Sequence, residues 1–234
     1  MNRIVLITGA SSGYGKATAK AFKASGDTVI MTARNFDRLE SARIEVGGDI
    51  AFSMDVTVPE DWEKALNIVK EKYGRLDILV NNAGGGITIK EAADFSTDEI
   101  DDVLKLNLNS VIYGCKTFAP MMKSQNTGTM INISSVCARQ SWPCWGVYGA
   151  AKAGVLNFSK SMYLEMRPYN VRVSCLIPAS ANTGFQEACG IANAPQKLGP
   201  ADIADTILYI ANLPQRAVVE DITVWGIDQE VNPL

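Results

Sequence analysis

Residues 4–15 read Ile-Val-Leu-Ile-Thr-Gly-Ala-Ser-Ser-Gly-Tyr-Gly, and this stretch decides the fold. Its first five residues are an apolar run without the alternation that marks a strand with one solvated face, so we expect a strand buried on both faces. A glycine-rich turn follows, and a helical pattern over residues 13–25 comes directly after it. The order of strand, turn and helix predicts the opening unit of an α/β fold.

The same alternation of short apolar runs and longer helical patterns continues to the C-terminus. We predict strands at residues 4–8, 28–32, 50–54, 76–80, 129–133, 171–177 and 222–225, and helices at residues 13–25, 37–46, 59–73, 97–122, 148–165 and 202–213. Helices between successive strands indicate parallel pairing. The sequence therefore predicts an α/β protein, a single-domain Rossmann fold over residues 1–234 with a doubly wound seven-stranded parallel sheet and helices on both faces.

Composition excludes several kinds of partner. The chain has 234 residues, 22 basic and 25 acidic, and a net charge of −3, which gives no electrostatic reason to bind nucleic acid. The apolar run at residues 4–7 is too short for a signal-peptide core or a membrane span. Five cysteines without a CxxC pair are typical of buried thiols in a reducing compartment. We therefore expect a cytoplasmic protein with no metal site and neither a membrane nor a nucleic-acid partner.

The sequence contains no histidine. This excludes Ser-His-Asp and Cys-His nucleophilic sites, histidine-ligated zinc, and a histidine acid or base. Proton transfer near neutral pH must instead come from a tyrosine, lysine, cysteine or carboxylate whose pKa is shifted.

The glycine turn has the spacing TGxxxGxG from Thr8 to Gly15. Gly9 permits the tight turn, Gly13 lets the backbone approach a pyrophosphate, and Gly15 allows close packing of helix and strand. The helix N-terminus then favours a diphosphate. No Gly-Lys-Ser/Thr ends the turn, so it is not a Walker A loop. We predict a dinucleotide site that also includes Ser11, Ser12 and Tyr14, the alternative being an ordinary glycine-rich turn.

The end of the second strand indicates which dinucleotide binds. An NAD site commonly has Asp or Glu there, but this chain has Ala33-Arg34 and no carboxylate before Asp37. The Arg34 guanidinium can pair with a 2′-phosphate. The sequence therefore favours NADP(H), although a solvated arginine at a strand end is the alternative.

Tyr148 and Lys152 lie four residues apart in a helical pattern, so they share one helix face. The Lys152 ammonium group, together with a nicotinamide cation, would lower the pKa of the Tyr148 phenol. Thirteen residues before Tyr148, Ser135 follows a predicted strand, at the sheet edge where α/β proteins bind ligands.

These motifs, with Asn81-Asn82-Ala83-Gly84 and Asn107, occur in an order and spacing that resemble the classical short-chain dehydrogenase/reductases over essentially the whole chain. The resemblance implies that Tyr148 is the catalytic acid or base and that Lys152 binds the nicotinamide ribose. It also implies that Ser135 holds the substrate oxygen, and that Asn107 holds a water that relays protons. The thirteen-residue spacing favours Ser135 over the adjacent Ser134.

The resemblance implies further cofactor contacts, from Asp55 and Val56 beside the adenine, from Asn82, Ala83 and Gly84 along the cofactor, and from Ile177, Pro178 and Thr183 at the nicotinamide. The chain departs from the family in two places: Ala179 stands where glycine is usual after Pro178, and Tyr14 replaces an aliphatic residue. Neither change removes one of the four catalytic positions, so we expect activity.

The expected reaction is NADP(H)-dependent hydride transfer between nicotinamide and a small or medium carbonyl compound or secondary alcohol. Candidate pocket residues are Gly85, Gly86, Cys137, Trp142, Cys144, Trp145, Ala179, Ser180 and Phe185. Arg139 could receive an anionic substrate, although a structural arginine is the alternative. Residues 184–199 fall where the family has its substrate lid.

We considered two other classes of protein, and we also expect an oligomer. A non-catalytic NADP-binding regulatory protein would have the glycine turn but would not require all four catalytic residues. An epimerase normally needs a larger C-terminal domain than the residues after Ile177 provide. The resemblance also implies a homotetramer, or a dimer, formed through the long helices at about residues 97–122 and 148–165.

Overall fold

A seven-stranded parallel sheet forms the centre of the molecule, with strand order β3-β2-β1-β4-β5-β6-β7. The computed structural model describes residues 2–86, 88–185, 189 and 198–229. The strands are β1 (Ile4–Thr8), β2 (Thr28–Ala33), β3 (Ile50–Ser53), β4 (Ile78–Asn81), β5 (Gly128–Ile133), β6 (Val171–Pro178) and β7 (Asp221–Val224). The prediction of a doubly wound parallel sheet is confirmed.

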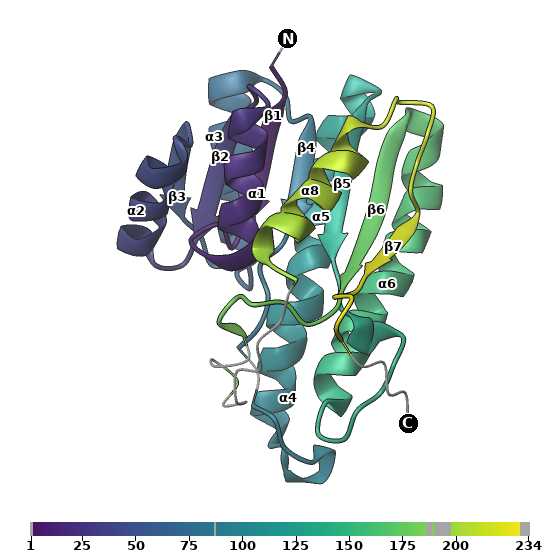
Figure 1. The fold of residues 1–234 in the computed structure, drawn as a ribbon. Helices are drawn as coiled ribbons and strands as arrows, with labels where there is room; N and C mark the ends of the chain where they lie inside the picture. Colours follow the sequence, from purple (N-terminus) through teal and green to yellow (C-terminus); the bar gives the residue numbers. More distant parts are fainter. Residues whose placement is uncertain (1, 87, 186–188, 190–197, 230–234) are drawn as a thin grey trace.

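Helices cover both faces of the sheet (Figure 1). One face carries α1 (Gly13–Ala24), α2 (Phe36–Val46) and α8 (Pro200–Asn212), and the other carries α3 (Pro59–Tyr73), α5 (Ser110–Gln125) and α6 (Gly146–Met166). The helix α4 (Thr97–Leu104) extends beyond the carboxyl ends of the strands. Among the described residues, no helix is long and apolar enough to cross a membrane.

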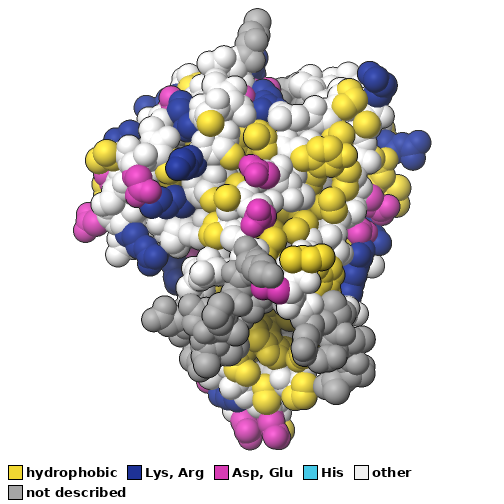
Figure 2. Space-filling model, in the orientation of Figure 1, with side chains coloured by type: hydrophobic (Ala, Val, Ile, Leu, Met, Phe, Trp, Pro, Cys, Tyr) yellow, Lys and Arg dark blue, Asp and Glu magenta, His cyan; other side chains and the backbone are white. Residues whose placement is uncertain are grey.

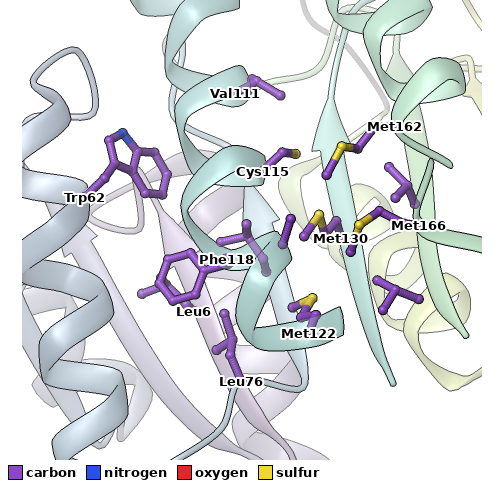
Figure 3. Packing of buried hydrophobic residues seen from close by; sticks show 14 of the residues in the cluster. Leu6, Trp62, Leu76, Val111, Cys115, Phe118, Met122, Met130, Met162 and Met166 are labelled. Atoms are coloured by element: carbon purple, nitrogen blue, oxygen red, sulfur yellow. The ribbon is translucent and has the colours of Figure 1, made fainter. Parts of the chain in front are cut away.

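The larger hydrophobic core lies between the sheet and the layer of α3, α5 and α6 (Figure 3). Trp62 of α3, Phe118 of α5 and Met130 of β5 are all almost completely buried there. The Trp62 indole also donates a 2.9 Å hydrogen bond to the carbonyl oxygen of Val56, which follows β3. A second core, between the sheet and α1, α2 and α8, fixes the other face. Because both faces are packed, the carboxyl ends of the strands have fixed positions.

Local signals account for most element boundaries. Asn35 caps α2 by accepting a 2.9 Å hydrogen bond from the Arg38 amide, and Gly47 ends that helix in the left-handed region at φ +72°. The strand β4 starts two residues later than predicted, at Ile78. The amide and carbonyl of Leu76 instead bind the Gln125 side chain, at 3.0 and 2.9 Å.

The predicted helix over residues 97–122 differs from the structure in two respects. The helical stretch ends at Gln125, three residues later than predicted. It is divided into α4 and α5 by a single π-helical turn at Lys105–Asn109. Such a turn has one residue more than an α-helical turn, and it is often found at functional sites. Here it contains Asn107, whose side chain is fully buried.

Candidate active site

A cavity of about 720 Å³ opens at the carboxyl ends of β1, β4, β5 and β6, which is a volume usual for small-molecule sites. The predicted site residues that line it are Gly9, Ser12, Gly13, Tyr14, Asn82, Ala83, Gly84, Ser135, Tyr148, Lys152, Pro178 and Thr183. The predicted pocket residues Gly85, Gly86, Cys137, Trp142, Trp145, Ala179, Ser180 and Phe185 line it too. Segments from all parts of the chain therefore meet in one cavity.

Thr8 and Asn82 join the ends of β1 and β4. The Thr8 hydroxyl accepts 3.0 Å hydrogen bonds from the amides of Asn82 and Ala83, and it donates to the carbonyl oxygen of Val80 at 3.4 Å. In return, the Asn82 side-chain amide donates to the carbonyl oxygens of Thr8 at 2.8 Å and Gly9 at 3.3 Å. These bonds hold the glycine turn against the segment that follows β4.

The glycine turn has the backbone that its sequence requires. Gly9 and Gly13 have φ angles of +65° and +52°, a region that side chains disfavour. A Cβ atom on Gly15 would lie 2.4 Å from the Gly9 oxygen and 2.6 Å from the Asn82 amide nitrogen. Gly15 therefore serves close packing, as predicted, and does not itself line the cavity. A narrow turn of backbone amides at the start of α1 fits a diphosphate, so the residues present suit a dinucleotide.

Two adjacent serines after β5 differ in their partners. The Ser134 hydroxyl donates a 2.8 Å hydrogen bond to the backbone oxygen of Lys152, which ties β5 to α6. Ser135 Oγ accepts from the Cys137 amide at 3.2 Å. The same hydroxyl is near enough to the Tyr148 phenol to act on its pKa. The geometry thus associates Ser135 with the tyrosine, in agreement with the thirteen-residue spacing.

Tyr148 and Lys152 lie on the cavity side of α6 and are 8% and 3% exposed. Burial raises the pKa of the Tyr148 phenol well above its usual range, and the neighbouring Ser135 hydroxyl opposes this rise. Burial also lowers the pKa of Lys152 to about 8. The sequence led us to expect a lowered pKa for Tyr148. In the protein alone the pKa of Tyr148 shifts in the opposite direction, because desolvation of the buried phenol is the largest contribution.

Asn107 fixes the loop beneath Lys152. Its side-chain amide donates to the carbonyl oxygens of Gly85 and Val103, both at 3.0 Å, and its oxygen accepts from the Gly85 amide at 2.9 Å. Both amide hydrogens are therefore used for structure. A Cβ atom on Gly84 would lie 3.1 Å from Asn107 Oδ1 and 3.3 Å from Lys152 Nζ. The buried asparagine thus supports the segment that faces Lys152.

Several predicted cofactor residues lie outside the cavity. Ser11, Gly15, Arg34, Asp55 and Val56 are not among its lining residues. Asn107, which we predicted as a catalytic residue, is not among them either. Asp55 accepts two hydrogen bonds from Thr57, at 2.9 and 2.7 Å, in the loop after β3. Arg34 is exposed at the end of β2, whereas Arg38, four residues later on α2, does line the cavity. We did not predict Arg38, although a second arginine four residues after Arg34 in the sequence is a signal that could have identified it.

Two other predictions concern Arg139 and Cys144. Arg139 forms an ion pair with Asp221 of β7 and donates a 2.9 Å hydrogen bond to the Thr223 hydroxyl, so it is structural rather than an anion receptor. Cys144 does not line the cavity, and its backbone has φ +70°. Gln229, near the C-terminus, lines the cavity although no local pattern predicted it. Within the described residues, no group of three or more His, Cys, Asp or Glu side chains could hold a metal ion.

The predicted lid at residues 184–199 lies mostly outside the described residues. Of this segment, the structure describes Gly184, Phe185, Cys189, Leu198 and Gly199. Phe185 is the one that contributes a large side chain to the cavity wall.

Comparison with known proteins identifies the family to which the chain belongs. The sequence profile described as short chain dehydrogenase matches residues 3–193. An uncharacterized oxidoreductase of Staphylococcus aureus strain N315 is 30% identical over 225 residues, which cover 95% of this chain and 96% of that protein. The chain therefore belongs to the short-chain dehydrogenase family and is an oxidoreductase.

Two solved structures are similar over the full length. An alcohol dehydrogenase from the archaeon Thermococcus sibiricus, complexed with 5-hydroxy-NADP, has a TM-score of 0.90 at 27% identity and covers 99% of this chain and 100% of its own. The closed form of a serine dehydrogenase, complexed with NADP⁺, has a TM-score of 0.91 at 26% identity and covers 99% of this chain and 98% of its own. Both relatives bind an NADP-type nucleotide.

Proposed function

We propose that the protein is an NADP(H)-dependent oxidoreductase that interconverts a small or medium carbonyl compound, either a ketone or an aldehyde, and the corresponding secondary or primary alcohol. The observation that carries this proposal is the meeting of Ser135, Tyr148 and Lys152 in the same cavity as the glycine turn. The cavity contains the two hydroxyl groups that a carbonyl oxygen needs and the turn that a dinucleotide needs.

The bound nicotinamide would supply or accept the hydride. In the reducing direction, Ser135 and Tyr148 hydrogen-bond the carbonyl oxygen, and Tyr148 gives it a proton. Burial keeps the Tyr148 pKa high in the protein alone, so the phenol begins this step protonated. The Lys152 ammonium group stabilises the phenolate that remains, which makes proton release easier than burial alone would allow.

Lys152 is suited to this task because its position is fixed. Its ammonium nitrogen donates a 3.0 Å hydrogen bond to the Ile133 carbonyl oxygen at the end of β5. An ammonium group has three donors, so two remain for a ribose hydroxyl and a water. Asn107, which holds Gly85, keeps the neighbouring loop in place. We propose that the proton-relay water binds beside this loop.

The preference for NADP(H) rests on two arginines near the end of β2. Neither the Arg34 nor the Arg38 guanidinium has a hydrogen-bond or carboxylate partner among the residues that the structure describes. A 2′-phosphate is a dianion that such groups bind well. The NADP-type ligands of the two similar structures support this choice.

The assembly we propose is a homotetramer, with a dimer as the alternative, in the cytoplasm. On the face in Figure 2, hydrophobic side chains gather over α8 and β7, and Lys and Arg lie mainly toward the rim. Tyr209 of α8 and Leu164 of α6 are 55% and 63% exposed, and β7 is an edge strand. Such surfaces suit contacts between copies. The five free thiols favour a reducing compartment.

Oxidation of NADPH, followed in the presence of a panel of carbonyl compounds, tests the proposed reaction. We expect turnover with at least one uncharged ketone or aldehyde. A non-catalytic NADP-binding regulator would bind NADPH but turn over none of the panel, and that result would contradict the proposal. Running the panel with NADH in parallel measures cofactor preference.

A further inference from the structure

Three aromatic side chains line the cavity together with Tyr148, and we refer to Trp142, Trp145 and Phe185 as the aromatic wall. The Trp145 and Phe185 rings are stacked, with centroids 6.5 Å apart and planes 26° apart. The Tyr148 ring contacts both of them: its centroid lies 5.6 Å from the Trp145 ring centroid and 6.0 Å from the Phe185 ring centroid. An apolar surface therefore begins directly at the phenol that gives the proton.

Segments far apart in sequence build this wall. Trp142 and Trp145 precede α6, whereas Phe185 follows β6 and reaches the loop after β4. A Cβ atom on Gly85 would lie 3.5 Å from the Phe185 ring. Cys137 joins the same cluster, and burial raises the pKa of its thiol, so at neutral pH this neighbour is uncharged. The side chains packed with Tyr148 thus include two aromatic rings and a neutral thiol.

Charged groups are scarce at this end of the cavity. Among the described lining residues, Arg38 and Lys152 are the cations, and no carboxylate is present. Arg38 follows β2, on the far side of β1 from Tyr148, and Lys152 is buried against the Ile133 carbonyl. Arg139, which could have received an anion, is paired with Asp221. The described wall therefore offers no partner for a carboxylate on the substrate.

We propose that the aromatic wall makes the enzyme selective for uncharged carbonyl compounds that carry an aromatic or alicyclic ring next to the reacting carbon. This inference rests on the proposed function and names its substrate class. A ring buried against aromatic side chains gains both apolar area and favourable ring contacts. A carboxylate in the same place loses its water without gaining a partner.

The test compares three matched aldehydes with NADPH: benzaldehyde, 4-carboxybenzaldehyde and propanal. We expect kcat/KM for benzaldehyde to be about tenfold or more higher than kcat/KM for propanal. It should be about a hundredfold higher than kcat/KM for 4-carboxybenzaldehyde. Serine with NADP⁺ adds a charged substrate, because one similar structure is of a serine dehydrogenase. The inference is overturned if kcat/KM for serine, propanal or 4-carboxybenzaldehyde equals that for benzaldehyde.

A substitution series assigns the selectivity to the wall. Trp145→Ala should lower kcat/KM for benzaldehyde about tenfold and that for propanal much less, and Trp145→Phe should restore most of the difference. An equal fall for both substrates would mean that Trp145 only positions Tyr148, which would overturn the inference. Phe185→Leu provides a second variant that keeps an apolar side chain. No turnover of any carbonyl, with NADPH binding intact, would instead contradict the proposed function itself.

Discussion

The ammonium nitrogen of Lys152 lies 5.6 Å from the centre of the Tyr148 ring, one helical turn along α6. Both side chains are buried, so each is charged only at an energetic cost. The lysine pKa is lowered to about 8, and the tyrosine pKa is raised, both mainly by burial. The pair is therefore a lysine that is still mostly protonated at neutral pH beside a phenol that keeps its proton until a reaction demands it.

This burial predicts that Lys152→Met stabilises the fold while it removes activity. A pKa lowered from 10.5 to about 8 corresponds to at most about 3 kcal/mol of destabilisation at neutral pH. Loss of the bond to the Ile133 carbonyl offsets about 1 kcal/mol of that. We expect the free energy of unfolding at pH 7 to rise by about 1–2 kcal/mol, measured by urea denaturation at fixed protein concentration.

The sign of the pH dependence provides the control. The unfolded chain keeps the lysine proton up to about pH 10.5, and the folded chain releases it near pH 8. The unfolded state therefore binds more protons in this window, and wild-type stability from this group rises with pH. The difference in the free energy of unfolding between Lys152→Met and the wild type should therefore shrink between pH 8 and 10.5. A constant difference across that range would show that burial of the charge is not the cause.

Ser134 and Ser135 form a matched pair for separating structure from catalysis. Ser135→Ala should lower kcat about a hundredfold, because it removes a hydroxyl aimed at the substrate oxygen. Ser134→Ala should leave kcat nearly unchanged and reduce stability by about 1 kcal/mol, because its hydroxyl holds the Lys152 backbone. Steady-state kinetics and thermal unfolding of both variants check this assignment, which the reverse pattern would contradict.

Gly15→Ala tests the packing of the glycine turn. The added methyl group would meet the Gly9 oxygen at 2.4 Å, so we expect about 1–3 kcal/mol of destabilisation and weaker NADPH binding. Gly146→Ala is the control, because its Cβ would lie 3.9 Å from Ala92, an ordinary contact. Isothermal titration with NADPH and thermal unfolding measure both effects. Equal behaviour of the two variants would argue against the tight contact at Gly15.

Arg38 and Arg34 are expected to set cofactor preference, with Arg38 the larger contributor because it lines the cavity. Arg38→Ala should raise KM for NADPH by about tenfold or more and leave KM for NADH nearly unchanged. Arg34→Ala should have a smaller effect in the same direction. An unchanged NADPH-to-NADH ratio in the double variant would mean that neither side chain binds the 2′-phosphate.

Local patterns in the sequence were sufficient to predict the strands, the glycine turn and the Tyr148–Lys152 pair, because each depends on spacing within one segment. The π-helical turn around Asn107 was not predictable in this way, since it depends on contacts with Gly85 on another segment. Gln229 reaches the cavity only because the chain returns to it after β7. The direction of the Tyr148 pKa shift likewise depends on burial, which a motif does not reveal.

The most direct test of the catalytic assignment is Tyr148→Phe, measured with NADPH and the best carbonyl substrate of the panel. This change removes one hydroxyl and leaves the aromatic ring in place in a side chain that is only 8% exposed. The fold and NADPH binding should therefore be retained. We predict that kcat falls by about a hundredfold to ten-thousandfold while the dissociation constant for NADPH stays close to that of the wild type. A variant that binds NADPH normally and keeps wild-type kcat would contradict the account.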